Sequence, residues 1–359
     1  MLMGMKAQFF RMLTRFIEVP AVRERLYHAS RDLFSQSGVA SLGGLHGLRS
    51  FPMPETYREV AHAKQADSVS GPVFITARFR SGSTFLWQLF REIDGITCYY
   101  EPLNERRWFM ENAPFKVDGT HLGVGDYRRE YQGMADLDAV FDENWTYRYL
   151  YMNGAHHDPR LVAYIDALIA RAQGRAVLQF NRVDFRLQWL RAHYPEARIL
   201  HLYRDPREQW MSVMGKGGAI APGFRYQEKQ LWGENDFYTL AWANDLRHVF
   251  PILEPAGRHP YEVHYLLWRL SYSFGRSFSD VSVGYEDLIA NFETVLSNAL
   301  TQLGIHNADL GKLAKLNQGQ MKSRWREYAP EDWFTEIETR CDREIGAFFA
   351  AFDGNNKNE

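Results

Sequence analysis

Short apolar runs alternate with segments of helical periodicity along most of this chain. Runs rich in β-branched and aromatic residues, each bounded by turn residues, predict strands at 73–76, 97–103, 176–180, 198–203 and 280–285. Apolar residues at helical spacing predict helices that begin at 83 and span 159–172, 185–193, 286–303 and 330–352, with two more between 236 and 278. Strands that alternate with helices form βαβ units, so the pattern predicts a three-layer α/β/α fold around a central parallel sheet.

The first 70 residues differ in pattern from the rest of the chain. Residues 6–34 are helically periodic with a break at Pro20, and residues 35–70 are richer in Gly, Pro and small side chains. We therefore predict a helical N-terminal extension, residues 1–70, that packs on a core domain of residues 71–359. A basic amphipathic helix on a membrane surface is an alternative for residues 6–34.

Composition and charge exclude several classes of protein. The formal net charge of the 359 residues is -2, which argues against nucleic acid as a main partner, because phosphate backbones require a basic surface. Two cysteines, Cys98 and Cys341, are too few for a disulfide framework or a Cys-based metal site. Arg11 and Arg15 interrupt the apolar N-terminal residues, so no signal peptide is predicted, and no run is long enough to span a membrane. We expect a soluble, cytoplasmic protein.

A turn of small residues, 81–84, joins the first predicted strand to the helix that follows it. Ser83 and Thr84 are suited to cap this helix, and Gly82 permits a tight turn. A strand that passes through such a turn into a helix directs free N–H groups and the positive end of the helix dipole at one point, and this geometry binds phosphate. The same pattern also fits a strand–turn–helix unit that binds no ligand.

The turn departs from a Walker loop, GxxxxGK[ST], at two positions. Ala77 stands where the first glycine would be, and Ser83 stands where a lysine would reach the β- and γ-phosphates. The cation instead precedes the turn, at Arg80. Such a loop can hold a terminal phosphate but lacks the groups that handle Mg-ATP, so we expect no metal.

A second basic position follows the strand at 198–203. Arg204 comes at its carboxyl end, and Ser212 lies eight positions later on the next predicted helix. Because ligands of open parallel sheets bind beyond the carboxyl ends of the strands, Arg204 is expected at the same crevice as Arg80. A guanidinium with a hydroxyl suits a second phosphate, although an ion pair of Arg204 with Asp205 is an alternative.

Four short segments are more specific together than any one of them alone: FRSGST at 79–84, RDPREQWMS at 204–212, VGYEDL at 283–288 and KSRWR at 322–326. This set resembles the motifs of the sulfotransferases, enzymes that use 3′-phosphoadenosine 5′-phosphosulfate (PAPS) as the donor. The motifs occur in the family's order over residues 73–326. The resemblance implies a P-loop-like sulfotransferase fold and a PAPS-dependent transferase that needs no metal.

The resemblance also implies a role for each matching position. The implied contacts are Arg80, Ser81, Gly82, Ser83 and Thr84 to the 5′-phosphosulfate, Arg204 and Ser212 to the 3′-phosphate, Phe85 and Tyr285 near the adenine, and Lys322, Ser323 and Arg324 over the 3′-phosphate. Arg80 is expected to face the bridging oxygen. Ser323 replaces the glycine of the late motif, so we expect the closer contacts from Lys322 and Arg324.

Glu101 is the candidate general base of the resemblance. It ends the second predicted strand, which we expect to pair with the first, and several relatives that modify carbohydrates or tyrosine carry a catalytic glutamate there. Partial burial would raise the pKa of Glu101 toward the working range of a base. A structural ion pair with Arg106 or Arg107 is an alternative. A histidine is the rival base, and the candidates in the irregular segment 104–158 are His121, His156 and His157.

Arg182 is the candidate for a second cation near the sulfate. The segment 179–184 resembles the strand end of the family, where a lysine or arginine follows an asparagine. The alternative is a surface arginine paired with Asp184.

The acceptor is the least specified part of the reaction. Glu-Pro-Leu at 101–103 resembles relatives that modify glycans, so we expect a hydroxyl on a carbohydrate or glycolipid. Aromatic residues between 108 and 151 and between 224 and 242 fit either sugar-stacking platforms or ordinary core. Transfer to a phenol, a small alcohol or a protein tyrosine is an alternative, as is a P-loop kinase of a small metabolite.

Overall fold

A computed structural model describes residues 45, 47–53, 71–110, 126–214, 220–233, 236, 238–317 and 323–356 of the chain. Almost all of the predicted N-terminal extension lies outside the described residues, as do Lys322 and His121. The predicted boundary at residue 70 therefore stays a prediction.

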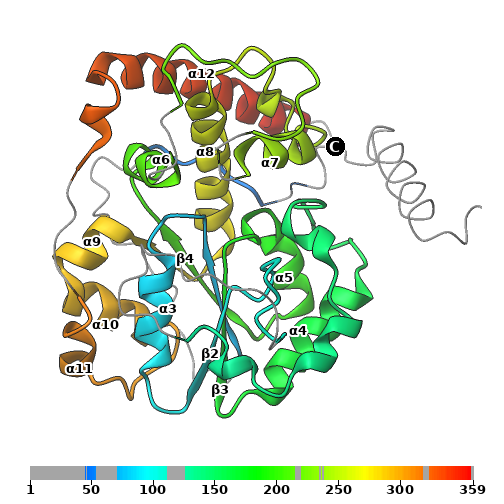
Figure 1. Ribbon diagram of the computed structural model, residues 1–359, viewed down its shortest axis with the longest axis vertical. Coiled ribbons are helices and arrows are strands. Elements are labelled where there is room, and N and C mark those ends of the chain that lie inside the picture. The colour runs from blue at the N-terminus through cyan, green and yellow to red at the C-terminus, as the bar shows by residue number, and fades with distance from the viewer. Residues whose placement is uncertain are drawn as a thin grey trace, which may run out of the picture. The chain divides into compact units, whose positions relative to one another are not determined.

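The centre of the fold is a five-stranded parallel sheet (Figure 1). The strands are β1 (Val73–Ala77), β2 (Ile96–Tyr100), β3 (Arg175–Phe180), β4 (Arg198–Tyr203) and β5 (Val281–Gly284), in the order β2-β3-β1-β4-β5. All five predicted strands are present, and β2 is shorter than expected because it ends before Glu101. The expected pairing of β2 with β1 is wrong: β2 pairs with β3, and β1 lies between β3 and β4.

Helices cover the sheet on both sides, which confirms the three-layer α/β/α arrangement (Figure 1). They are α3 (Ser83–Arg91), α4 (Pro159–Arg171), α5 (Leu187–His193), α6 (Pro206–Met214), α7 (Thr239–Leu246), α8 (Pro260–Phe278), α9 (Tyr285–Ala290), α10 (Phe292–Gln302), α11 (Leu310–Ala314) and α12 (Glu331–Asn356). The helix predicted over 286–303 is two helices, because the chain leaves helical geometry at Asn291. α4 begins as its sequence indicates, since the Asp158 carboxylate accepts the N–H of Leu161 and Pro159 fills the first turn.

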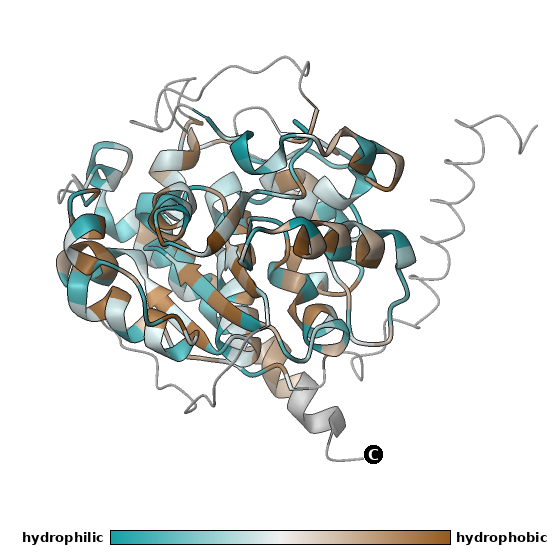
Figure 2. Cartoon of the chain, turned by 90° about the horizontal axis from the view of Figure 1, so that it is seen from below, coloured by the Kyte–Doolittle hydropathy of each residue, from teal (hydrophilic) through white to brown (hydrophobic). Residues whose placement is uncertain are grey.

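Helix α8 is the most deeply buried helix of the core, with residues 260–275 all buried. It lies against β4 at Gly275, where an added Cβ would come within 2.3 Å of the His201 ring. His201 bonds the Ser282 hydroxyl at 2.7 Å, and burial lowers its pKa to about 3, so it is a neutral core residue. In Figure 2 hydrophobic residues, in brown, occur in the strands and in the helices around them, interspersed with hydrophilic residues in teal.

The segment 126–158 contains short 3₁₀ helices, η3 (Arg129–Tyr131), η4 (Ala135–Ala139) and η5 (Glu143–Thr146). Arg186, which is fully buried, holds the end of this segment. Its guanidinium donates five hydrogen bonds of 2.9–3.2 Å to the carbonyl oxygens of Trp145, Arg148, Tyr149 and Arg182. A chain without regular ladders thereby satisfies its buried carbonyls with one side chain.

Replacing Arg186 with methionine should therefore leave these carbonyls unsatisfied and lower the free energy of unfolding by about 3–5 kcal/mol. Urea denaturation measures the change. The matched control is Arg171→Met, which breaks an exposed ion pair with Asp136 at 2.5 Å and should cost no more than about 1 kcal/mol. Equal losses in the two variants would contradict the role of Arg186.

Candidate active site

The turn after β1 is closed from within by its own residues. The Ser81 hydroxyl and the Ser81 N–H both donate to the carbonyl of Arg78, at 2.7 and 3.3 Å. Arg80 and Gly82 have φ of 65° and 94°, so the chain passes twice through the left-handed region. Gly82, and not Ser83 or Thr84, occupies the N-cap position of α3, and no side chain caps this helix. The expected hydroxyl cap is therefore wrong, and the turn is made by backbone geometry.

The Tyr285 ring presses on Gly82. A Cβ built on Gly82 would lie 2.3 Å from two ring carbons of Tyr285, at the start of α9. Arg204 contacts the same ring, with its guanidinium 5.2 Å from the ring centroid. The loop motif, the Arg204 motif and the Tyr285 motif thus meet through one ring.

Arg80, Arg204 and Ser212 form one connected group. The Arg80 Nε donates to the Ser212 hydroxyl at 2.9 Å, and Arg204 Nη1 donates to the Arg80 carbonyl at 3.1 Å. The residues of both predicted anion sites are therefore in contact, although they follow β1, follow β4 or lie on α6. Arg204 Nε makes no hydrogen bond within the described part of the chain.

Glu286 is the carboxylate nearest to Arg204, with Oε1 3.9 Å from Nε. The expected alternative partner, Asp205, instead accepts the N–H groups of Arg207 and Glu208 at the start of α6. Burial raises the pKa of Glu286 to about 7, since the charged form is poorly solvated there. A carboxyl that is easily protonated leaves the positive charge of Arg204 only partly neutralised.

Glu101 follows directly on a residue that contacts the loop. The Thr84 and Tyr100 hydroxyls share a hydrogen bond of 2.9 Å, and Tyr100 is the residue before Glu101. Burial raises the pKa of the Tyr100 phenol, so this group stays protonated. Glu101 is 8% exposed and has φ of 39°, a strained backbone typical of functional positions.

Burial raises the pKa of Glu101 above its ordinary value of 4.5, and the Arg182 charge and an Asn104 hydrogen bond oppose that effect. This direction is the one expected for a general base. Arg107, one of the alternative ion-pair partners of Glu101, pairs instead with Asp138 and Glu143. Among the histidines, His156 bonds the Asn153 amide oxygen in a turn, and His157 is exposed.

Arg182 is buried, not a surface arginine as the alternative expected. Its side chain is 2% exposed, and it contacts Glu105 Oε2 at 2.6 Å and Glu101 Oε2 at 3.8 Å. Asp184 has other partners, since it accepts hydrogen bonds from Thr76 and Ser271 and pairs with Arg78. The structure therefore brings Arg182 to Glu101.

A model of the sulfotransferase family matches residues 72–309, which is more than half of the chain. The chain belongs to the sulfotransferase family. The match spans the first three motifs and confirms the predicted family, whereas the fourth segment, residues 322–326, lies beyond it. A search of curated protein sequences found no match.

Three solved structures that are similar to this chain are distant from it in sequence. A sulfotransferase from Alicyclobacillus acidocaldarius is 12% identical, with a TM-score of 0.36, over 79% of this chain and 98% of the other. Sulfotransferase STF9 from Mycobacterium avium is 11% identical, with a TM-score of 0.42, over 80% and 78%. The sulfotransferase domain of the Synechococcus PCC 7002 olefin synthase is 14% identical, with a TM-score of 0.31, over 79% and 91%. The family assignment rests on the match over residues 72–309.

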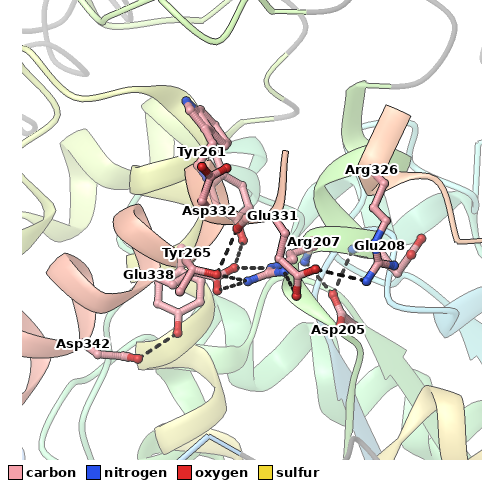
Figure 3. A network of polar contacts seen from close by, with 12 residues as sticks. Asp205, Arg207, Glu208, Tyr261, Tyr265, Arg326, Glu331, Asp332, Glu338 and Asp342 are labelled. Carbon is pink, nitrogen blue, oxygen red and sulfur yellow. Dashed lines mark hydrogen bonds and ion pairs between the residues drawn. The ribbon is translucent and has the colours of Figure 1, made fainter. Parts of the chain in front are cut away.

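The fourth motif of this sulfotransferase is attached to the second through Arg207. The Arg207 guanidinium lies 4.6 Å from the Trp325 ring. It also bonds Glu338 of α12 at 2.6 Å (Figure 3). Glu338 also accepts the Tyr261 hydroxyl of α8. These contacts hold Trp325 beside the start of α6, which follows Arg204 in the chain. Ser323 and Arg324 themselves are exposed.

Phe85 is half-buried, and its ring lies 6.2 Å from that of Phe292 on α10. Its role near the adenine stays a prediction, as do the donor contacts expected of the other motif residues. No helix in the described ranges is long and apolar enough to cross a membrane. Within the same ranges, no group of three or more His, Cys, Asp or Glu side chains is arranged to hold a metal ion.

Two residues of the site were missed by the sequence analysis. Glu105 binds Arg182, and the Tyr238 hydroxyl donates to Glu105 at 2.9 Å. The spacing of Glu105, four positions after Glu101, was the available signal, but the irregular chain between them has no period from which a shared face could be read. Tyr238 starts α7, far away in sequence, and only the fold brings it here.

The contact of Tyr285 with Gly82 predicts the cost of a side chain in the loop. Gly82→Ala should lower the free energy of unfolding by about 2–4 kcal/mol, because the new Cβ combines a left-handed backbone with a clash against an aromatic ring. Gly133→Ala is the matched control, since Gly133 has φ of 75° and nothing within 4 Å of an added Cβ. Urea denaturation should give only about 1 kcal/mol for this control; equal costs would refute the ring contact.

Proposed function

We propose that this sulfotransferase moves the sulfuryl group of PAPS to an acceptor hydroxyl, with Glu101 as the general base. The observation that carries the proposal is that one loop contacts both halves of such a reaction. On the side expected to hold the donor, the Arg80 side chain donates a hydrogen bond to Ser212, and the Arg80 carbonyl accepts one from Arg204. Thr84 bonds Tyr100, the residue before Glu101, on the side expected to hold the acceptor.

The donor side suits an anion with phosphate at both ends of its ribose. Arg80 and Arg204 supply two cations, and the nine-residue helix α3 directs its N-terminal N–H groups toward the turn. The unused Nε of Arg204 supports a ligand at this point, since buried guanidinium donors are normally satisfied. Family membership favours sulfuryl transfer over the phosphoryl transfer of the kinase alternative.

The proposed chemistry is a single in-line displacement. The acceptor oxygen forms a bond to sulfur while the bond from sulfur to the bridging phosphate oxygen breaks, and adenosine 3′,5′-bisphosphate leaves. The acceptor proton passes to Glu101. Negative charge grows on the bridging oxygen, so Arg80 and the N-terminus of α3 stabilise the transition state more than the ground state. Positioning and electrostatics supply most of the catalysis, as in phosphoryl transfer.

We propose a carbohydrate or glycolipid hydroxyl as the acceptor. The large hydrophobic side chains that are most exposed among the described residues, Phe224, Leu231 and Trp232, lie in one segment, 220–233. The Trp232 ring lies 6.5 Å from that of Tyr238, whose hydroxyl bonds Glu105 in the site. Exposed aromatic rings next to a catalytic centre are suited to stacking on sugar rings. Assays that offer labelled PAPS with sugars, lipids or phenols would compare these classes of acceptor.

Adenosine 3′,5′-bisphosphate should stabilise the protein without magnesium. At about 100 times its Kd it should raise the Tm by roughly 5 °C, because a ligand that binds only the native state shifts unfolding by mass action. Arg204→Ala should abolish most of this shift. Arg198→Ala is the matched control, since Arg198 starts the same strand and pairs with Asp280 away from the loop. Stabilisation by Mg-ATP alone would overturn the proposal.

Glu101→Gln should lower kcat by roughly 10²–10⁴, the range for a general base, and leave the bisphosphate-induced shift in Tm unchanged. In the wild type, activity should fall as the pH drops through the raised pKa of Glu101, because the protonated carboxyl cannot accept the acceptor proton. Steady-state rates between pH 4 and pH 9 measure both effects. A Glu101→Gln variant with wild-type kcat would remove Glu101 from the mechanism.

A further inference from the structure

One cation, Arg182, lies between two carboxylates in the site. Its Nη2 bonds Glu105 at 2.6 Å, whereas its Nη1 is 3.8 Å from Glu101, beyond hydrogen-bond distance. The guanidinium also lies over the ring of Phe79, 4.8 Å from its centroid, and bonds the Asn181 amide oxygen. Arg182 is thus held on the Glu105 side by contacts that Glu101 does not make.

Glu105 is itself fixed at both oxygens. Oε2 accepts from Arg182, and Oε1 accepts the Tyr238 hydroxyl at 2.9 Å. Tyr238 has φ of 68° at the start of α7, and its ring packs 5.7 Å from that of Phe79. Glu105 therefore joins the irregular segment after β2 to α7 and competes with Glu101 for a single guanidinium.

We propose that Glu105 is a positioning residue that draws Arg182 away from Glu101 and so keeps the Glu101 carboxylate available to accept a proton. This inference rests on the proposed function, in which Glu101 is the base. A carboxylate in a short bond to a guanidinium is a weak base, because the cation stabilises its charged form. The 3.8 Å separation keeps the Arg182 charge near the reacting groups without that cost.

The groups that face Glu101 support this division of roles. Arg182 comes from the end of β3, Glu105 and Asn104 from the chain after β2, and Tyr100 from β2 itself. Burial and the Glu105 charge raise the pKa of Glu101, whereas the Arg182 charge and the Asn104 hydrogen bond lower it. Without Glu105, the negative charge that raises the pKa of Glu101 disappears, and Arg182 loses its carboxylate partner and can pair with Glu101.

The test is a pH titration of Glu101 in the Glu105→Gln variant. The titration is monitored by ¹³C NMR of protein labelled at the glutamate carboxyl carbons. The Glu101 signal is assigned by its loss in Glu101→Gln. Moving a guanidinium from 3.8 Å to hydrogen-bond distance should lower the pKa of Glu101 by about one unit or more. In steady-state kinetics, the acid limb of the profile of kcat against pH should shift to lower pH by the same amount. The plateau value of kcat should fall several-fold. Bisphosphate affinity should not change.

Two further variants separate positioning from general damage. Glu105→Asp retains the charge and should restore part of the shift in the pKa of Glu101. Glu143→Gln removes an exposed carboxylate that pairs with Arg107, and should leave both the titration and the kcat profile unchanged. An unchanged pKa of Glu101 in Glu105→Gln would overturn the positioning role even in an active enzyme. A wild-type protein that transfers no sulfuryl group would instead refute the proposed function, while the NMR titration would still decide whether Glu105 controls Glu101.

Discussion

The central position of β1 is the constraint on which the site depends. β3 and β4 flank β1 in parallel, so the chain segments that leave these three strands emerge at the same edge of the sheet. β1 delivers the Arg80–Gly82 turn, β3 delivers Arg182, and β4 delivers Arg204. Three cations from separate parts of the sequence therefore converge without any of them having to extend across the molecule.

Two of these three arginines, Arg182 and Arg204, each lie beside a buried or partly buried carboxyl group. Burial raises the pKa of Glu101 next to Arg182 and that of Glu286 next to Arg204. In each pair burial makes the carboxylate a better proton acceptor than an exposed glutamate, and the arginine beside it opposes that effect.

Much of this architecture could be predicted from the chain alone. The five strands and most helices follow local apolar patterns, and the family follows from four motifs, since both depend on residues close together in sequence. The helix cap at 83–84 was predicted wrongly, because a left-handed glycine competes with hydroxyls for that position, and residue type does not reveal φ. The pairing partner of β2 was also wrong, because strand order is a long-range property that no local pattern records.

The sequence by itself thus determined which segments are strands and helices, where arginines and small polar residues follow them, and which family the chain joins. Only the tertiary structure decided which carboxylate meets which arginine. Arg182 was paired with Asp184 in one reading of the sequence, yet Asp184 turns to Thr76 and Ser271, and Glu105 takes its place. The physical reason is that a buried charge is satisfied by whatever the packing of distant elements supplies, and nearness in sequence has no weight in that choice.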